Sequence, residues 1–181
     1  MKSYNQIIKG VKNSDRRSQM AFYDLFYRSV FQSAFSILSS HEEAEEIMHD
    51  TFLKVFSNAS LLLDDFNAMN RFLKRIAANH AIDVMRKRKD FIFLADDEDW
   101  MDVADEADNE EYELTVSDIK DGIAHLSPAY RSIISLRLFE DMSFAEIAGQ
   151  LKLNASTARV QYSRGILKLR TFLQQKIDEY V

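Results

Sequence analysis

Residues 143–170, SFAEIAGQLKLNASTARVQYSRGILKLR, carry the pattern on which the interpretation of this chain rests. Ser143 and Glu146 are spaced as a capping box, in which two side chains satisfy free backbone N–H groups where a helix begins. After a break at residues 152–154, Asn154 is suited to begin a second helix, because its side-chain oxygen accepts from backbone N–H groups. Two helices joined by a short turn predict a helix-turn-helix, whose second helix enters a DNA groove.

Charge is distributed unevenly along the 181 residues, although the formal net charge is only −6. Residues 152–177 hold six basic side chains and no acidic one, and residues 71–89 hold seven basic and one acidic. Residues 90–121, between these blocks, hold fourteen Asp or Glu and one Lys. A plain helical hairpin would explain the periodicity of residues 143–170 equally well, but the two basic blocks favour surfaces that face phosphate. The acidic excess also predicts that residues 90–121 fold back and screen the basic helices in the free protein.

Composition and periodicity predict an all-α fold. Apolar residues make up 46% of the chain, with four Gly and one Pro, and they recur at helical spacing. Besides the pair above, we expect helices over residues 4–11, 16–39, 41–57, 68–89 and 128–139, and a helical stripe over 116–126 in a unit that begins near Tyr112. In the helix over 16–39, the stripe that begins with Met20 and Tyr23 is expected to face the core, with Phe22 and Phe26 broadening it.

The expected helices form two small domains. Residues 90–111 are acidic and lack a sustained helical period, which predicts an extended linker. This gives a helical domain over 1–89 and a second over 112–181, which contains the helix-turn-helix.

Several classes of protein are excluded by the same composition. Without Cys, the chain has no disulfide and no thiolate metal site. The sequence from His41 to Glu45 begins like a zinc-protease helix but lacks the second His, so we expect no metal and no cofactor. No nucleophile–base or paired-carboxylate pattern stands out, which predicts that the protein is not an enzyme. The N-terminus lacks the apolar core of a signal peptide and no apolar run reaches membrane-spanning length, so we expect a cytoplasmic protein without membrane insertion.

The helix over 41–57 has an acidic face with aromatic neighbours. A second capping box, Ser40 and Glu43, predicts where it begins. A solvated acidic face and a docking surface for a basic partner both explain this pattern. The side chains concerned are Glu45, Glu46, His49, Asp50, Phe52 and Phe56.

Three blocks of the chain together resemble an ECF (extracytoplasmic function) sigma factor, a bacterial RNA polymerase initiation subunit of the sigma-70 family. Residues 42–56, EEAEEIMHDTFLKVF, are similar to the helix that docks on the polymerase clamp in this family. Residues 71–89, RFLKRIAANHAIDVMRKRK, are similar to its promoter-melting and minus-ten-reading helix, and residues 126–170 to its minus-thirty-five domain. The chain departs from the family at His49, where Gln is common, and at Lys152, where Gly is common.

The resemblance implies the partners and the residues that contact them. The partners are core RNA polymerase and promoter DNA, and members of the family are often held inactive by an anti-sigma factor. Polymerase contact is implied for the acidic and aromatic residues of 41–57 named above. Upstream-element contact is implied for Ser156, Thr157, Arg159, Ser163 and Arg164, with Arg159 expected to bond a base. Minus-ten contact is implied for Lys74, Arg75, Asn79, Arg86 and Arg88, with the loop over 58–67.

Two other functions fit part of the sequence. A stand-alone helix-turn-helix regulator would use the N-terminal helices for dimerisation or sensing, which leaves the basic residues of 71–89 unexplained. A purely helical interaction protein or adaptor would explain the acidic faces but not the second basic block. We therefore expect a transcription initiation factor that binds core polymerase, directs it to promoters and helps to melt the minus-ten element.

Overall fold

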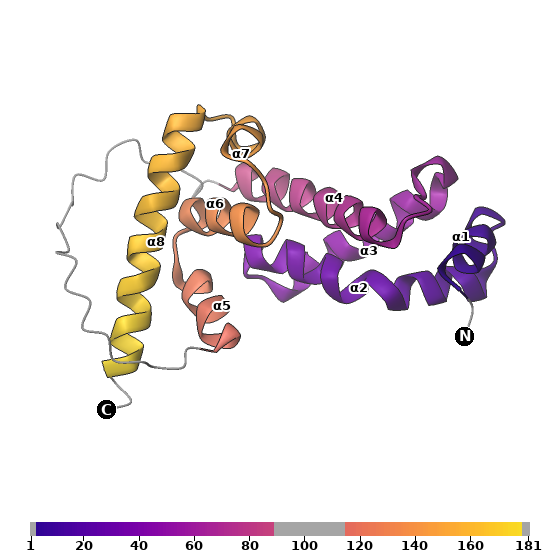
Figure 1. Ribbon diagram of the computed structural model, residues 1–181, viewed down its shortest axis with the longest axis horizontal. Helices are drawn as coiled ribbons and strands as arrows, with labels where there is room; N and C mark the ends of the chain where they lie inside the picture. The colour runs from indigo at the N-terminus through magenta and orange to yellow at the C-terminus, as the bar shows by residue number, and fades with distance from the viewer. Residues whose placement is uncertain (1–2, 89–114, 179–181) are drawn as a thin grey trace.

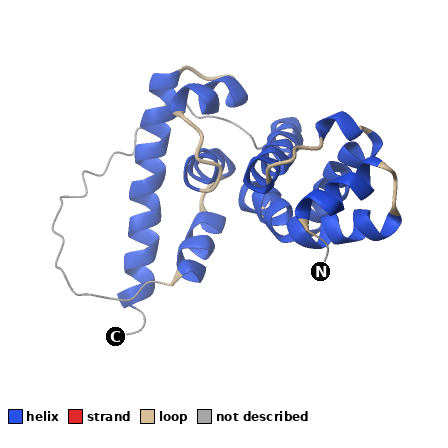
Figure 2. Ribbon diagram, turned by 45° about the vertical axis from the view of Figure 1, so that its right-hand side comes forward, coloured by secondary structure: helices blue, strands red, loops and turns tan. Residues whose placement is uncertain are grey.

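The computed structural model describes residues 3–88 and 115–178, and within them every regular element is a helix (Figures 1 and 2). The elements are α1 (Tyr4–Lys12), α2 (Arg16–Leu38), α3 (His41–Ser57), the 3-10 turn η1 (Ala59–Leu61), α4 (Phe66–Lys87), α5 (Val116–His125), α6 (Pro128–Leu138), α7 (Phe144–Leu151) and α8 (Ala155–Asp178). The all-α prediction is confirmed, whereas the acidic linker expected over 90–111 lies outside the described residues. None of the described helices has the length and apolar character needed to span a membrane.

Helix α2 is the centre of the N-terminal group and packs against α1, α3 and α4. Phe22 and Phe26 have no exposed surface, and their rings meet edge to face with centroids 4.9 Å apart. The prediction that Met20 faces the core is wrong, because its side chain is 60% exposed. Tyr23 and Tyr27 lie at the edge of the core, half-buried and stacked on each other.

Side-chain caps set the starts of the helices. Helix α4 begins two residues before the predicted position, because Asp65 Oδ1 accepts from Ala68 N at 2.6 Å. The hydroxyl of Ser40 accepts from Glu43 N at 3.4 Å, so this half of the second capping box is confirmed. The carboxylate of Glu43 accepts from Arg88, which joins α3 to the end of α4.

In the C-terminal group, the long helix α8 packs against α5, α6 and α7 (Figure 1). Gly165 lets α8 approach α6 closely, since a Cβ there would lie 2.9 Å from Ile134 Cδ1. Tyr130, one turn before Ile134 on α6, lies 3.3 Å from that position. A side chain at residue 165 would therefore push the two helices apart.

The two groups of helices touch along a contact that we call the joint, formed by α2 and α4 on one side and α5, α6 and α7 on the other (Figure 2). Ile133, Leu136 and Met142 belong to the same buried cluster as Leu73 and Met85 of α4. Apolar packing thus continues from one group into the other within the described residues.

The carboxylate of Asp118 connects helix α5 to α8, and its pKa is unusually low. Asp118 accepts from the Thr115 hydroxyl at 2.6 Å and from Lys176 Nζ at 2.9 Å. These bonds, that of Thr115 above all, lower the pKa of Asp118 from 3.8 to about 2. A depressed pKa adds stability above the ordinary value, and this stability is lost as the pH falls toward the folded-state pKa.

We expect Asp118→Asn to lower the urea midpoint of unfolding near neutral pH. The difference from the unsubstituted protein should shrink as the pH falls from about 4 to about 2, where the carboxylate of the folded protein becomes protonated. Asp178→Asn, which removes an exposed carboxylate at the end of α8, should not show this pH dependence. A constant difference between the Asp118 variant and the unsubstituted protein across that range would contradict the assignment.

Candidate nucleic-acid interface

The helix-turn-helix has the local structure that the sequence predicts. Ser143 Oγ accepts from Glu146 N at 3.3 Å, while Glu146 Oε2 accepts from Ser143 N at 2.9 Å, which completes the capping box of α7. Asn154 Oδ1 accepts from Thr157 N at 2.7 Å and so caps α8. The turn is closed by a backbone bond from Leu153 N to the Ala148 carbonyl at 2.9 Å.

Lys152 takes the place of the glycine that often ends the first helix of such a motif. Its φ of 55° and ψ of 43° are left-handed, a conformation in which Gly is unstrained and a Cβ is disfavoured. The sequence thus builds the turn with a strained residue, and the geometry is held by the caps on either side.

The first turns of α8 present a polar surface with one apolar side chain. Ser156, Arg159 and Ser163 are exposed, whereas Thr157 and Arg164 are half-buried, so the five residues assigned to the upstream element are not equally accessible. Val160, which the sequence interpretation missed, is 45% exposed beside Arg159. The sequence signal for Val160 was an apolar residue at a position outside the buried stripe of the helix.

Arg159 is held by an aromatic ring. Its Cζ lies 5.9 Å from the centroid of Phe144, and Arg137 Cζ lies 5.4 Å from the same centroid. A guanidinium over an aromatic face is attracted by the ring, which reduces the number of orientations that the arginine samples. Ser156, by contrast, donates its hydroxyl to Asn154 Oδ1 at 2.6 Å, so its side chain is committed to the cap.

Two basic side chains of α4, Lys74 and Arg75, contact the C-terminal group. Lys74 Nζ lies 3.4 Å from Glu140 Oε1 and also donates to the carbonyl of Phe139. Arg75 Nη2 lies 3.2 Å from Glu146 Oε1. The side chain of Glu140 is only 6% exposed, and this burial raises its pKa against the opposing effect of Lys74.

The rest of the predicted minus-ten set lies farther along α4 and at its C-cap, Arg88. Arg86 Nη1 lies 3.5 Å from Asp83 Oδ1, and Arg88 pairs with Glu43, whose pKa is lowered chiefly by that hydrogen bond. Asn79 Oδ1 is buried and has no hydrogen-bond partner among the described residues. A buried amide oxygen without a partner costs about 1–3 kcal/mol, so Asn79 would gain from a hydrogen-bond donor brought by a ligand.

The acidic face of α3 is largely as predicted, with one correction. Glu45, Glu46, His49 and Asp50 are exposed. Phe52 is only 3% exposed, so its ring belongs to the core and cannot be part of a docking surface. The ring packs inward against Phe22 and Tyr23, because the core of this group is built largely from aromatic side chains. Leu53 is 65% exposed and takes its place on that face, while Phe56 is half-buried.

Comparison with known proteins identifies the family. Residues 22–91 match the family model for sigma-70 region 2, and residues 117–169 match that for sigma-70 region 4. The ECF RNA polymerase sigma factor SigW of Bacillus subtilis is 27% identical, over 92% of this chain and 95% of that protein. The RNA polymerase sigma factor CarQ of Myxococcus xanthus is 29% identical, over 86% of this chain and 91% of that protein.

A solved structure has the same fold. The sigma factor RpoE from Bartonella quintana, in complex with the anti-sigma factor NepR, aligns with a TM-score of 0.53 and 23% identity over 86% of this chain and 96% of that one. With region 2, region 4 and the ECF relatives together, the chain belongs to the sigma-70 family, in its ECF group. It is therefore an initiation factor that directs RNA polymerase to promoters.

The strained turn before α8 generates a prediction about stability. Lys152→Gly should raise the free energy of unfolding by about 1 kcal/mol, because glycine adopts the left-handed conformation without a clash. Lys152→Ala removes the same charge but keeps the Cβ, and it should give no gain. Urea unfolding followed by circular dichroism measures the free energy of unfolding of both variants. Equal values for the two would contradict the assignment of backbone strain to Lys152.

Proposed function

We propose that the two groups of helices divide promoter recognition between them. The region over 1–89 binds core polymerase and the minus-ten element and helps to melt it, the region over 112–181 binds the minus-thirty-five element, and 90–111 links them. The observation that carries this is the accessible start of α8, where Arg159 lies over Phe144 in a capped helix-turn-helix. The protein acts by binding, without catalysis, in the cytoplasm where the polymerase works.

In the upstream element, Arg159 contacts a base. An arginine that enters the major groove makes two hydrogen bonds to guanine, worth about 1–3 kcal/mol of discrimination. Val160, exposed beside it, suits an apolar contact with a thymine methyl group. Ser163 and the half-buried Thr157 and Arg164 then fix the helix on the phosphates.

In the minus-ten element, α4 captures unstacked bases and their phosphates. Lys74, Arg75, Arg86 and Arg88 supply positive charge along one helix. Asn79 Oδ1, buried without a partner among the described residues, would accept from the amino group of a captured base. Single-strand binding commonly combines such cations with sites that hold individual bases.

The exposed face of α3 is the surface for core polymerase. Glu46 and Asp50 provide negative charge, and Leu53 provides an apolar centre between polar neighbours. Interfaces of this kind gain specificity from charge and affinity from a buried apolar residue. Glu45 and His49 lie on the same face, and Phe52 and Phe56 support it from within the helical core.

Regulation by a protein partner is part of the proposal. The related RpoE structure contains the anti-sigma factor NepR, and we extend this class of partner to the present chain. A stand-alone regulator would use the same α8 geometry, but the region 2 match over residues 22–91 favours the initiation factor.

Adding the purified protein to bacterial core polymerase tests the function, with promoter-specific transcripts as the readout.

The double variant Glu46→Lys, Asp50→Lys should lose most core binding in a pull-down, because it reverses the charge of the α3 face while leaving the buried side intact. The single variant Asp50→Lys is compared with Asp178→Lys, which reverses one charge at the end of α8. Asp178→Lys should bind core polymerase normally. Undiminished core binding by the double variant would contradict the assigned surface.

Arg159→Ala tests the base contact. The variant should lose discrimination at one position of the upstream element, by about 1–3 kcal/mol in competition binding with single-base substitutions. Ser163→Ala, whose side chain is assigned to phosphate, should instead weaken binding to all sequences by a similar small factor. A uniform loss for Arg159→Ala across every upstream sequence would show that it contacts the backbone.

A further inference from the structure

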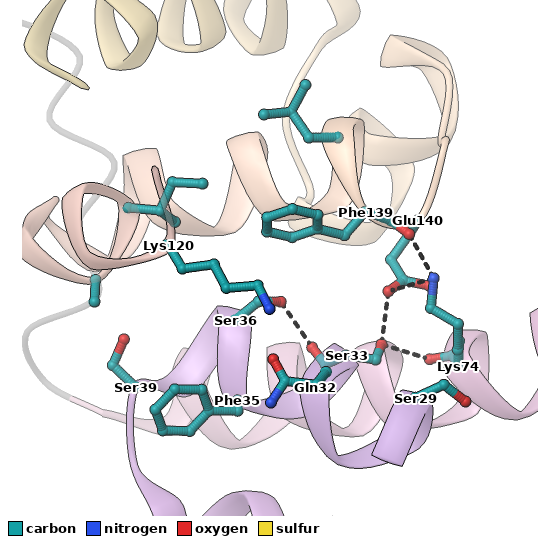
Figure 3. A pocket seen from close by; sticks show the side chains of 13 residues that line it. Ser29, Gln32, Ser33, Phe35, Ser36, Ser39, Lys74, Lys120, Phe139 and Glu140 are labelled. Carbon is teal, nitrogen blue, oxygen red and sulfur yellow. Dashed lines mark hydrogen bonds and ion pairs between the residues drawn. The ribbon is translucent and has the colours of Figure 1, made fainter. Parts of the chain in front are cut away.

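The joint brings carboxylates of the C-terminal helices onto cations of α4. Glu140 lies just after α6, and its Oε1 is 3.4 Å from Lys74 Nζ (Figure 3). Glu146, in the first turn of α7, is 3.2 Å from Arg75 Nη2. Lys74 and Arg75 are two of the α4 cations assigned above to the minus-ten element.

The first of these contacts is enclosed. The side chain of Glu140 is only 6% exposed, and it also accepts from Ser33 Oγ at 2.8 Å. Lys74 Nζ makes a further bond to the carbonyl of Phe139, so its charge is turned toward the joint. A DNA phosphate could not reach Lys74 Nζ in this arrangement, because the carboxylate of Glu140 already occupies the position beside it.

The second contact lies at the edge of a cleft of about 530 Å³ between α4 and the turn that joins α6 to α7. Cations line one wall of this cleft and acids line the opposite wall. The charged lining residues are Arg71, Lys74 and Arg75 from α4, and Glu140, Asp141 and Glu146 from the C-terminal side. The acids on the opposite wall would repel the phosphates of a DNA strand in this cleft, because little water would separate the like charges.

Other bonds hold the joint in this register. Ser135 Oγ donates to the Ser36 carbonyl at 2.8 Å, and Arg131 Nη1 donates to the Leu38 carbonyl at 3.3 Å. Each of them connects α6 to the C-terminal end of α2. The two carboxylates are thus placed by a packed contact and not by flexible side chains alone.

We propose that the joint is a closed state in which Glu140 and Glu146 occupy the places of DNA phosphates on α4, so that promoter contact by α4 requires the joint to open. The proposal rests on the function proposed above, since it concerns the regulation of the minus-ten surface. It assigns the inhibition to two described acids, Glu140 in the turn after α6 and Glu146 in the first turn of α7, both outside the acidic segment 90–121.

The joint has features of a contact that opens. A cavity of about 390 Å³ lies within it, with Phe35, Ile123 and Phe139 among its lining, so the apolar side chains there are incompletely packed (Figure 3). The pair Arg75–Glu146 is largely exposed, and such a pair contributes little to stability. The enclosed Lys74–Glu140 pair gives up hydration that both groups regain on opening.

A reversible crosslink tests whether closure blocks DNA. The chain has no Cys, and Gln32 of α2 and Lys120 of α5 are exposed residues that line the same cavity from opposite sides of the joint. The variant Gln32→Cys, Lys120→Cys is treated with a short, reducible thiol-to-thiol reagent. Its affinity for fluorescein-labelled single-stranded DNA of mixed sequence should be at least about tenfold weaker than after reduction. The two single-cysteine variants, treated identically, report the effect of the reagent itself.

The carboxylates are tested in the same background. Glu140→Gln with Glu146→Gln removes both charges but keeps their shape, and Gln at residue 146 retains the capping box. This change should lower the crosslinking yield and tighten DNA binding of the reduced protein. Glu42→Gln with Asp178→Asn removes the same charge at exposed positions outside the joint and should leave the crosslinking yield unchanged.

The outcomes separate this inference from the proposed function. Crosslinking no greater than in the single-cysteine variants would overturn the closed state. Equal DNA affinity before and after reduction would overturn the inhibition, even if the protein supports promoter-specific transcription with core polymerase. A protein that fails in transcription but binds DNA more tightly after reduction would overturn the proposed function and leave the closed state supported.

Discussion

Burial of helix α6 on two opposite sides is the constraint on which the arrangement of the described residues depends. Ile133 and Leu136 are packed into the cluster shared with the N-terminal helices, while Tyr130 and Ile134 are packed against α8. A helix with apolar side chains on two faces must be covered on both faces. The part of α6 that α8 leaves uncovered is therefore covered by α2 and α4, and this contact brings Glu140, just beyond the helix end, onto Lys74.

Polar groups on α6 make this burial specific. Ser132 and Ser135 are buried with the apolar side chains, and Ser135 donates to the Ser36 carbonyl. Arg131 donates to the carbonyls of Leu38, Ala124 and Leu126, so one guanidinium connects α2, α5 and the start of α6. Buried donors that find partners in only one register favour that register over a slid or rotated one, because each lost bond leaves an uncompensated polar group.

Sequence reasoning succeeded where the determining contacts are local. The caps at Ser143 and Asn154 involve neighbours within one turn, so spacing alone predicts the helix-turn-helix. It failed where two apolar faces compete on one helix. Helix α2 has large apolar side chains on several sides, and periodicity could not tell that Phe22 is buried while Met20 is exposed. Phe52 was misplaced for the same reason, since an aromatic residue beside acids fits either a docking face or a core.

The pairing of α4 cations with distant acids could not be predicted from spacing. Lys74 and Glu140 lie far apart in the sequence, and the sequence interpretation assigned Lys74 to the minus-ten element and Glu140 to no site. The acidic excess of 90–121 did suggest internal screening, and two of its described members, Asp118 and Asp121, do pair with Lys176 of α8. The acids that reach Lys74 and Arg75 are nevertheless Glu140 and Glu146, outside this segment, because the packing of α6 decides which carboxylates reach them.

The same packing limits how the joint can open. Separating α6 from α2 and α4 exposes Ile133 and Leu136 to water, and fully burying or exposing such a side chain changes the free energy by about 1.5–3 kcal/mol. A ligand shifts an equilibrium only by the difference between its affinities for the two states. DNA phosphates can replace Glu140 and Glu146, but they cannot cover these apolar side chains. The free protein therefore opens only in part on DNA, and a partner that binds the separated groups at surfaces such as α3 completes the opening when its affinity difference exceeds the remaining apolar cost.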